Sequence, residues 1–359
     1  MDLNQSTQGK RYLFFITQNY SYAILRPLQS EILLRGGEVA WFLMGEQVSA
    51  HYLRANETQL KQVSQVKAWQ PDACFAPGNV LPNFFPGKKI ALFHGFNVTK
   101  RVQKNGLSTH FKIRGCFDLY CTQGPNTTKT FQQLANEHGY FKVQETGWSA
   151  MDPLFKPSKD NPYLAEQDPR PTLLVCSTFS HRLSLAPRLY QQIKDYSQSG
   201  KWRILVQFHP KMAKEIVSQY QELQNDNLTF VETDNVIPLL QAADVMLCDT
   251  SSVLLMFLLQ RKPVVTFRNQ DPQPHLLNIT KADKVEAAIE QALTRPAELM
   301  KKIEDYCQEL HPYQDGLSSQ RVLAATNQLI GADNTELKSK PLNLMRELKI
   351  RKKLGYWGW

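Results

Sequence analysis

The chain has 359 residues, of which 42% are apolar, enough to bury a large core and to favour two domains over one. Its formal charge of +9 is concentrated at the carboxyl end. Residues 338–359 contain seven Lys and Arg and one Glu, which leaves a charge of only +3 to the other 337 residues. Since no zinc-finger, homeodomain or aromatic RNA-binding pattern accompanies this charge, the sequence argues against nucleic acid as a partner.

The remaining composition is typical of a cytoplasmic protein without a resident metal. The first apolar run, Tyr12 to Ile16, follows an acid at Asp2 and is too short for a signal peptide, and no later run is long enough to span a membrane. The six cysteines lie mostly within apolar runs, without C-x-x-C or Cys/His metal spacing, which predicts reduced core thiols. We predict no cofactor and no protein-built metal site, and a divalent ion that arrives with a substrate stays open.

Strand-length apolar runs alternate with helix-length segments along most of the chain, which predicts parallel sheets with crossover helices. A first series lies at 12–16, 38–43, 89–94 and 118–122. After a polar, proline-containing stretch, a second series lies at 172–179, 203–210, 228–233, 244–250 and 263–267. We therefore predict an α/β protein with two doubly wound, Rossmann-like domains at 1–155 and 172–335, a linker at 156–171 and a tail at 336–359.

Two histidines stand at the ends of predicted strands. Ligands of doubly wound sheets bind at the carboxyl ends of the strands, so two such domains are expected to face a central cleft that holds the substrate. His94 is followed by Gly95, which lets backbone approach a ligand, and a few residues later by Lys100 and Arg101. His209 is followed by Pro210, which ends the strand. A lone histidine is more often structural, but the strand-end position favours a functional role for both.

Small polar residues follow the predicted strand at 244–250. Asp249, Thr250, Ser251 and Ser252 precede an apolar segment of helix length. The first N–H groups of a helix have no intrahelical partner and attract anions, so this is a candidate phosphate site. Taken alone, an ordinary N-cap at Asp249, Ser251 or Ser252 is the commoner explanation.

A third pattern lies in HPYQDGLSSQRV at 311–322. Asp315 and Gly316 predict a turn, and Ser318 or Ser319 is expected to cap the next helix. Arg321 would then lie in the first helical turn, where a guanidinium can bind two phosphate oxygens. By itself such an arginine is more often a solvated surface residue.

In their order along the chain, these patterns resemble the CDP-glycerol glycerophosphotransferase family, the teichoic-acid primases and polymerases, over roughly residues 90 to 325. The matching elements are His94-Gly95, a G-x-x-x-x-D-x-L/F segment in GWSAMDPLF at 147–155, His209-Pro210, Asp249 to Ser252 with the later Lys262-Pro263, and Asp315-Gly316 with Ser319 and Arg321. Their order is more specific than any one of them.

The chain departs from the family pattern at two places. Thr250 replaces the usual tyrosine, and CSTFSHR at 176–182 replaces a Pro-Thr-Trp-Arg-like sequence. Arg182 is expected to supply the missing cation from a shifted position.

The resemblance implies a GT-B-like fold whose first domain meets the acceptor and whose second domain binds the nucleotide donor. It implies an enzyme in which a hydroxyl of a cell-surface glycan or lipid-linked acceptor attacks the phosphorus next to the glycerol, or another alditol, of a CDP-activated donor and releases CMP. We expect His94 to be the general base and His209 to stabilise the departing CMP.

The other expected site residues fall into two sets. The donor-binding residues are Gly95, Arg182, Pro210, Asp249, Thr250, Ser251, Ser252, Asp315, Gly316, Ser319 and Arg321, and the acceptor-side residues are Lys100 and Arg101. Asp315 can orient Arg321, bind a donor hydroxyl or serve only as a turn residue.

The basic tail ends in Tyr356, Trp357 and Trp359, which suit an anionic membrane interface. On a helical projection Leu344, Met345 and Leu348 face one way and Ile350, Leu354 and Trp357 another. A flexible anchor or a helix packed on the protein therefore fits as well as an in-plane amphipathic helix. We expect peripheral attachment to the inner face of the cytoplasmic membrane.

Two other functions compete with the transferase. One is a GT-B nucleotide-sugar glycosyltransferase or a related 2-epimerase, which would share the doubled sheet and the diphosphate site. The other is a non-catalytic protein that binds a glycan or a membrane surface, which would leave His94 and His209 without a role.

Overall fold

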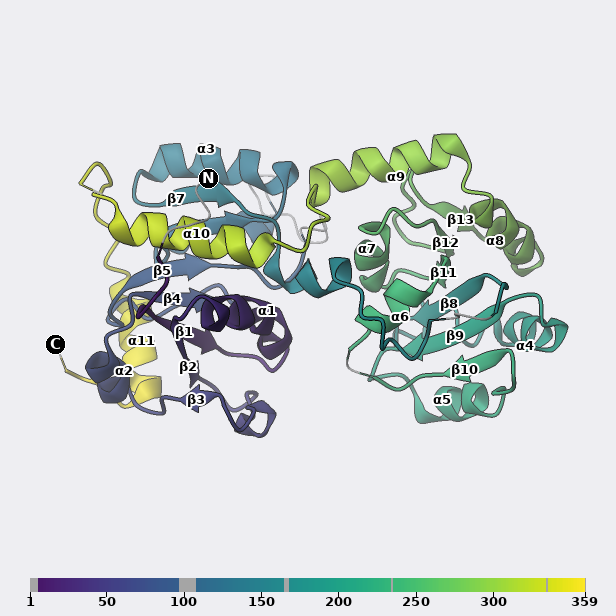
Figure 1. Cartoon of the computed structure of the whole chain (residues 1–359), viewed down its shortest axis with the longest axis horizontal. Helices are drawn as coiled ribbons and strands as arrows, with labels where there is room; N and C mark the ends of the chain where they lie inside the picture. The colour runs from purple at the N-terminus through teal and green to yellow at the C-terminus, as the bar shows by residue number, and fades with distance from the viewer. Residues whose placement is uncertain (1–5, 97–107, 165–167, 234, 334, 359) are drawn as a thin grey trace. The chain divides into compact units, whose positions relative to one another are not determined.

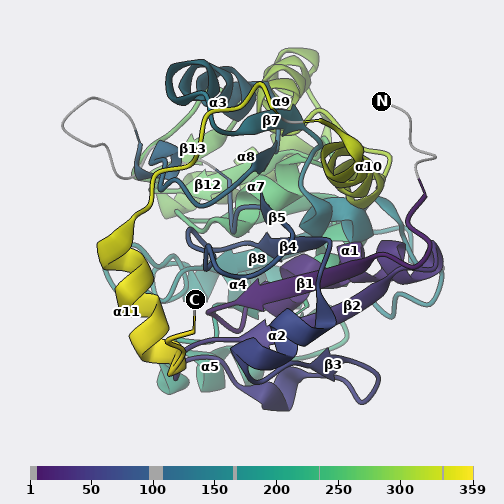
Figure 2. The ribbon, with the colours of Figure 1, turned by 90° about the vertical axis from the view of Figure 1, so that its left-hand side faces the viewer.

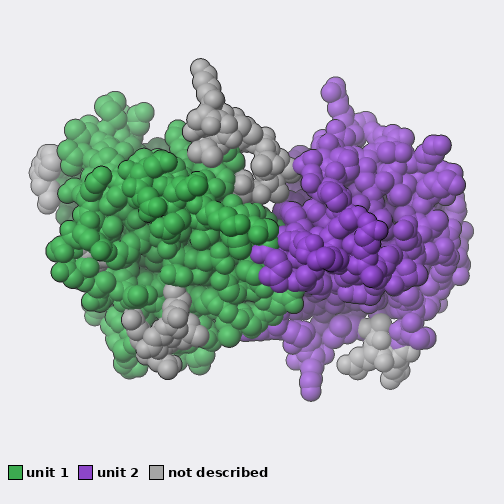
Figure 3. All heavy atoms as spheres, turned by 90° about the horizontal axis from the view of Figure 1, so that it is seen from above, with its two compact units in different colours: residues 1–152, 309–359 green, residues 153–308 purple. Residues whose placement is uncertain are grey.

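The computed structural model describes residues 6–96, 108–164, 168–233, 235–333 and 335–358. Two compact units make up the chain (Figure 1). Unit 1 contains residues 1–152 and 309–359, and unit 2 contains residues 153–308; Figure 3 colours them green and purple. Each unit has its own parallel sheet, which confirms the predicted α/β fold with two Rossmann-like sheets.

The sheet of unit 1 is parallel, with the strand order β3-β2-β1-β4-β5-β6-β7. Its strands are β1 (Arg11–Ile16), β2 (Glu38–Leu43), β3 (Thr58–Gln59), β4 (Ala73–Ala76), β5 (Lys88–Ala91), β6 (Leu119–Thr122) and β7 (Lys142–Glu145). Its helices are α1 (Ser21–Leu34), α2 (Val63–Trp69), α3 (Pro125–His138), α10 (Ser318–Gly331) and α11 (Leu344–Leu354), with short 3-10 turns at Ala50–Tyr52, Thr109–Phe111 and Ser149–Phe155.

Both faces of this sheet are buried, as the continuous apolar runs of its inner strands predict. Along β1, Leu13 and Phe15 point into a core that includes side chains of α2 and α3. The alternate residues, Tyr12, Phe14 and Ile16, point into a second core with α1 and α10. The strand order reverses between β1 and β4, and it is next to such a point that doubly wound sheets bind ligands.

The sheet of unit 2 is also parallel, with the order β10-β9-β8-β11-β12-β13. Its strands are β8 (Thr172–Ser177), β9 (Arg203–Phe208), β10 (Leu228–Phe230), β11 (Val245–Cys248), β12 (Val264–Phe267) and β13 (Leu277–Ile279). Its helices are α4 (Tyr190–Ser199), α5 (Lys214–Gln221), α6 (Ile237–Ala242), α7 (Val253–Leu258), α8 (Val285–Leu293) and α9 (Ala297–Leu310), with a 3-10 turn at Ala282–Lys284. The last two residues of α9 belong to unit 1.

The structure divides the chain differently from the predicted boundaries. The first unit ends at Asp152 rather than at residue 155, and the second ends at Gln308 rather than at residue 335. The chain returns to unit 1 because α10 buries apolar side chains, among them Val322 and Leu323, in the core that it shares with α1. Since these side chains fill a core made from a distant part of the sequence, their destination is not visible in the local pattern.

Residues 336–358 are not a free tail. Lys340 forms an ion pair with Asp118 at 2.7 Å, and Arg346 donates to the carbonyl of Arg114. Ile350 is 6% exposed, and Leu354 packs against the core on the α2 and α3 side. Figure 2 shows α11 in yellow along the edge of unit 1. Of the predicted possibilities for this segment, the structure therefore supports a helix packed on the protein.

All six cysteines are buried and unpaired. Within the ranges that the structure describes, no helix is both long and apolar enough to cross a membrane.

Candidate active site

Three neighbouring strands of unit 2 bring predicted site residues to one edge of its sheet. The strands β9, β8 and β11 are adjacent and parallel, so their carboxyl ends lie side by side. His209 directly follows β9, the loop at 178–186 follows β8, and Asp249 directly follows β11. Three patterns that are far apart in sequence thus meet at the place where doubly wound sheets bind ligands.

The buried side chain of Asp249 holds the loop after β8 in place at this edge. Its side chain is fully buried and accepts hydrogen bonds from the Ser177 hydroxyl at 2.7 Å, the Thr178 N–H at 3.1 Å and the Leu185 N–H at 3.0 Å. Burial raises the pKa of this carboxyl, and the hydrogen bonds oppose the shift. The expected direct contact with a donor is therefore wrong for Asp249, because its carboxylate is used to hold the loop after β8.

The next three residues differ in how available they are. The Thr250 hydroxyl accepts the N–H of Gln270 at 3.4 Å, so it too contacts the chain. Ser252 is exposed and its side chain makes no capping hydrogen bond, and α7 begins one residue later. Ser251 is half-buried beside it. The two serines, rather than Asp249 or Thr250, present hydroxyls that a ligand can use.

His209 is held in one tautomer by the backbone. The N–H of Lys211 donates to its Nδ1 at 3.0 Å, so Nδ1 carries no proton and the neutral ring has its proton on Nε2. The ring packs against Phe179 with 4.5 Å between centroids. Partial burial, and in second place the charge of Lys211, lower the pKa of His209. The neutral ring is therefore the favoured form, and its Nε2–H is a hydrogen-bond donor.

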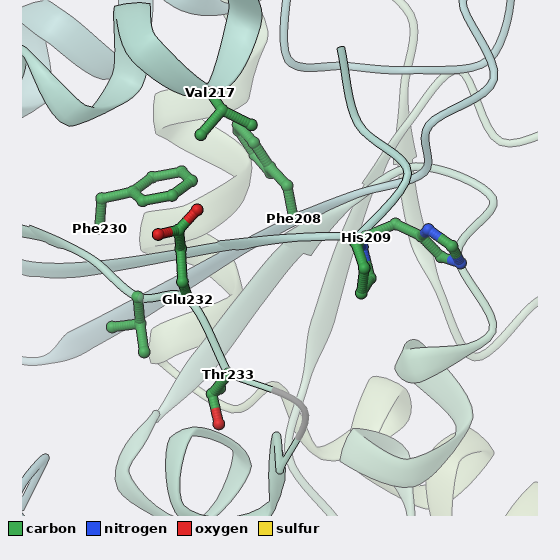
Figure 4. A pocket seen from close by; sticks show the side chains of 8 residues that line it. Phe208, His209, Val217, Phe230, Glu232 and Thr233 are labelled. Carbon is green, nitrogen blue, oxygen red and sulfur yellow. The ribbon is translucent and has the colours of Figure 1, made fainter. Parts of the chain in front are cut away.

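A pocket of about 400 Å³ opens beside His209 at the ends of β9 and β10 (Figure 4). Its walls are mixed in character, with Phe208, Val217 and Phe230 on the apolar side and Glu232 and Thr233 on the polar side. In the view of Figure 4 the ring of His209 points away from Glu232. An apolar pocket with a few polar groups at its rim is typical of small-molecule sites.

Two further predicted residues flank this edge. Pro210 is exposed and lines the pocket next to His209. Arg182 is exposed in the loop after β8, and its guanidinium makes no hydrogen bond or ion pair with the part of the chain that the structure describes. Its charge is thus available to an anion at the same edge of the sheet.

His94 in unit 1 has the opposite tautomer from His209. It lies exposed just beyond β5, and its Nδ1 is 3.1 Å from the carbonyl oxygen of Pro77. Since a carbonyl can only accept, Nδ1 must carry the proton, and the neutral ring has a free lone pair on Nε2. Gly95 is fixed through its carbonyl, which accepts from Gln123 at 3.1 Å, and no atom lies within 4 Å of the position of an added Cβ. Lys100 and Arg101 lie outside the described residues.

In unit 1, residues 147–152 are hydrogen-bonded to the segment at 311–322. Gly147 has φ +76°, and an added Cβ would lie 2.4 Å from the Ser318 hydroxyl, so only glycine fits. The N–H of Trp148 donates to Nε2 of His311 at 2.9 Å. Asp152 accepts the N–H groups of Ser318 and Ser319 at 2.8 and 2.7 Å. The predicted cap by Ser318 or Ser319 is therefore wrong, because a carboxylate from 166 residues upstream caps α10 instead.

The remaining predicted residues, at 315–321, also belong to unit 1. Ser319 is 3% exposed, which does not agree with a direct contact to a donor. Arg321 forms an ion pair with Asp315 and lies over the Tyr313 ring, 4.1 Å from its centroid. Gly316 has φ +66°, which the turn after Asp315 requires.

Asp315 therefore orients Arg321, one of the roles considered from the sequence. Burial alone would raise the pKa of Asp315. The ion pair with Arg321 and the hydrogen bond from the Leu317 N–H outweigh burial and hold this pKa below its usual value. Tyr313 is in turn fixed by Glu145, whose carboxylate accepts its hydroxyl at 3.1 Å.

Sequence reasoning missed several residues that shape these sites. Phe179 covers His209, and Asp152, Tyr313 and Glu145 hold the start of α10 and Arg321. Only Asp152 had a visible signal, since it belongs to the G-x-x-x-x-D-x-L/F segment. The others act through contacts that join strands and loops distant in sequence.

One segment of the chain matches a known protein family in sequence. Residues 180–274 match the model of the family described as CDP-Glycerol:Poly(glycerophosphate) glycerophosphotransferase. This segment contains His209 and Asp249 to Ser252, so the resemblance predicted from the ordered motifs is confirmed. Over this segment the chain is similar to the CDP-glycerol glycerophosphotransferases. No curated protein matches the chain in sequence.

Solved structures with the same fold support the architecture. The wall teichoic acid polymerase TagF is 14% identical and has a TM-score of 0.62, with 92% of this chain and 91% of that chain covered. A UDP-N-acetylglucosamine 2-epimerase from Listeria monocytogenes is 14% identical, with a TM-score of 0.58 and coverage of 92% and 99%. MnaA of S. aureus, solved with UDP, is 13% identical, with a TM-score of 0.61 and coverage of 92% and 100%. The fold of this chain is GT-B-like.

Proposed function

We propose that this protein transfers a glycerol-phosphate or related alditol-phosphate unit from a CDP-activated donor to a hydroxyl of a cell-surface glycan or lipid-linked acceptor, and releases CMP. The observation that carries the proposal is that two histidines, each following a strand, are held in opposite tautomers. Nε2 of His94 has a free lone pair, and Nε2 of His209 has a proton to donate. Phosphoryl transfer needs a base for the nucleophile and a donor for the leaving group.

In the proposed reaction His94 removes the proton of the acceptor hydroxyl. The acceptor oxygen forms a bond to the phosphorus that carries the alditol, and the bond from that phosphorus to the oxygen of CMP breaks. The negative charge then appears on the CMP phosphate. Hydrogen bonds that are already oriented toward developing charge are among the largest contributions to catalysis.

Unit 2 is the proposed donor site. His209, Ser251 and Ser252 would donate to the diphosphate, and Arg182 would add a positive charge, because all of them lie at one edge of the sheet. The adjoining pocket, with its apolar wall and Glu232 at the rim, is of a size to hold part of the nucleoside. A TagF variant has been solved after a soak with CDPG, which is consistent with a CDP-linked donor for this fold.

Arg321, Asp315 and Gly316 belong to unit 1, so their expected role toward the donor remains a proposal separate from the unit 2 site. The same holds for Lys100 and Arg101 toward the acceptor. In the described ranges, no group of three or more His, Cys, Asp and Glu residues is arranged to hold a metal ion.

A ligand panel tests the donor class. A ligand that binds only the native state raises stability by about 2.7 kcal/mol at a concentration of one hundred times its Kd. We expect CDP-glycerol or CDP-ribitol to raise the thermal unfolding temperature, and we expect His209→Ala to reduce this protection. Protection by UDP-N-acetylglucosamine alone would instead support the 2-epimerase or glycosyltransferase alternative, since a UDP-N-acetylglucosamine 2-epimerase shares the fold. Glycan or membrane binding that survives loss of both histidines, without turnover in the parent, would support a binding protein.

We also propose that α11 attaches the protein to an anionic membrane surface, on the cytoplasmic face. The helix leaves Leu344, Met345 and Leu348 exposed by 64%, 72% and 49%. Lys349 and Lys352 are exposed on the same helix, whereas its one acid, Glu347, is 9% exposed and accepts the N–H of Asn83. An apolar surface surrounded by lysines is suited to the interface of an anionic bilayer.

Vesicle flotation tests this attachment. The protein should float with vesicles of phosphatidylcholine and phosphatidylglycerol but not with phosphatidylcholine alone, since each lysine near an anionic surface contributes about 1 kcal/mol. Replacing Leu344 and Leu348 by Gln should reduce flotation strongly. Leu34→Gln is the matched control, because Leu34 is 81% exposed on α1 of the same unit. Equal flotation of the parent and the double variant would contradict the proposal.

A further inference from the structure

Tyr20 is an exposed aromatic side chain directly beside His94. It is 48% exposed, and its ring centroid lies 5.9 Å from that of His94 with 34° between the ring planes. The two residues reach this place from different loops, since Tyr20 follows β1 and His94 follows β5, with β4 between the two strands. No sequence pattern pointed to Tyr20.

The loop that carries Tyr20 is held by hydrogen bonds. The Asn19 side chain accepts the N–H of Ser49 at 2.9 Å, and the Gln18 amide donates to Gln47 at 2.9 Å. Behind Tyr20, the N–H of Ser21 donates to the carbonyl of Gln18 and helix α1 begins. The ring is therefore presented by a loop with fixed ends, and a ligand that binds it has little ordering cost to overcome.

The backbone next to His94 is open. The position of an added Cβ on Gly95 has no atom within 4 Å, its two chain neighbours aside. Nε2 of His94 carries the free lone pair, and the Tyr20 ring lies beside the same imidazole. A molecule that brings a hydroxyl to this nitrogen can therefore also contact the exposed Tyr20 ring.

We propose that Tyr20 is a carbohydrate-binding residue, on which the sugar ring or alditol chain of the acceptor packs while one of its hydroxyls meets His94. This inference rests on the proposed function and assigns the chemical class of the acceptor. The face of an aromatic ring carries partial negative charge and attracts the slightly positive C–H bonds of a sugar. The phenol oxygen at the rim of the ring can both donate to and accept from the hydroxyls of the same molecule.

Binding of simple carbohydrates tests the inference without requiring turnover. We expect methyl β-glycosides and alditols to bind the full-length protein weakly, with NMR shift changes at Tyr20 and His94. Tyr20→Ala should weaken this binding, and raise the KM for the acceptor in a transfer assay, by about three- to tenfold. Tyr20→Phe keeps the ring and should retain most of the affinity. Tyr52→Ala is the matched control, because Tyr52 is 50% exposed in the same unit.

The possible results separate the two proposals. Parent protein that binds none of these carbohydrates, or Tyr20→Ala that binds them like the parent, would overturn the role of Tyr20. Loss of donor protection in Tyr20→Ala would also overturn it, because an acceptor residue should not affect the donor. Failure of every CDP-alditol to protect the parent rejects the proposed donor instead, and carbohydrate binding would then still report on Tyr20.

Discussion

His94→Ala is expected to lower turnover by about 10² to 10⁴, the usual contribution of a general base, while CDP-glycerol binding stays nearly unchanged. The reason is geometric. The carbonyl of Pro77 holds the proton of His94 on Nδ1, so Nε2 is the nitrogen that can accept a proton from an acceptor hydroxyl. His94 belongs to unit 1, whereas the proposed donor groups belong to unit 2. Single-turnover transfer assays and donor titrations measure the two effects separately.

Two further variants sharpen this experiment. His94→Gln keeps a side-chain N–H that can donate to the Pro77 carbonyl but has no basic nitrogen, so it should be as inactive as His94→Ala. His51→Ala is the control, because His51 is an exposed histidine of the same unit. Equal loss of donor affinity in His94→Ala, or activity retained in His94→Gln, would contradict the assignment of the base.

Asp249→Ala is expected to lower the free energy of unfolding of the protein by about 2 to 4 kcal/mol. The substitution removes the acceptor of the Thr178 and Leu185 N–H groups, and each N–H left unpaired costs about 1 to 3 kcal/mol. The Ser177 hydroxyl keeps the Ser184 hydroxyl as a partner. Urea unfolding monitored by tryptophan fluorescence measures the change. Because the loop after β8 loses its anchor, protection by a CDP-alditol should fall as well.

The control is Asp226→Ala, since Asp226 is an exposed aspartate of the same unit, and such a substitution usually changes stability by less than 0.5 kcal/mol. Asp249→Asn removes the charge of the side chain and keeps its shape. The amide oxygen can take the place of Oδ2, but the NH₂ group would then face the Thr178 N–H, so Asp249→Asn should recover only part of the lost stability. A change below 0.5 kcal/mol in Asp249→Ala would show that the buried carboxylate does not organise the loop.

The predicted and observed strands show which strands can be predicted from the sequence. The six-residue strand β2 was predicted at its observed bounds, and β8 and β9 began at the predicted residues, because long apolar runs stand between polar turns. The short strands β3, β4, β7 and β13 were missed. β7 is KVQE, with every residue only half-buried, so its place in the sheet depends on pairing with β6 and not on its own composition.

The site residues divide in the same way. The positions of His94 and His209 at strand ends could be predicted, since each follows an apolar run and precedes a glycine or a proline. Their opposite tautomers could not, because these depend on the Pro77 carbonyl and the Lys211 N–H. Asp249 was expected at the ligand, but only the packed loop after β8 shows that its carboxylate is occupied.

The amino-acid sequence by itself determined the class of fold, the strand-end histidines and the family resemblance, because hydrophobic periodicity and ordered short motifs are local properties of the chain. The tertiary structure decided where the chain returns to unit 1 and that Tyr20 lies beside His94. It also decided the contacts of Gly147 and Asp152 with the start of α10. These features arise from contacts between segments up to hundreds of residues apart. Such contacts depend on the folded positions of both segments, so the sequence of one segment alone does not predict them.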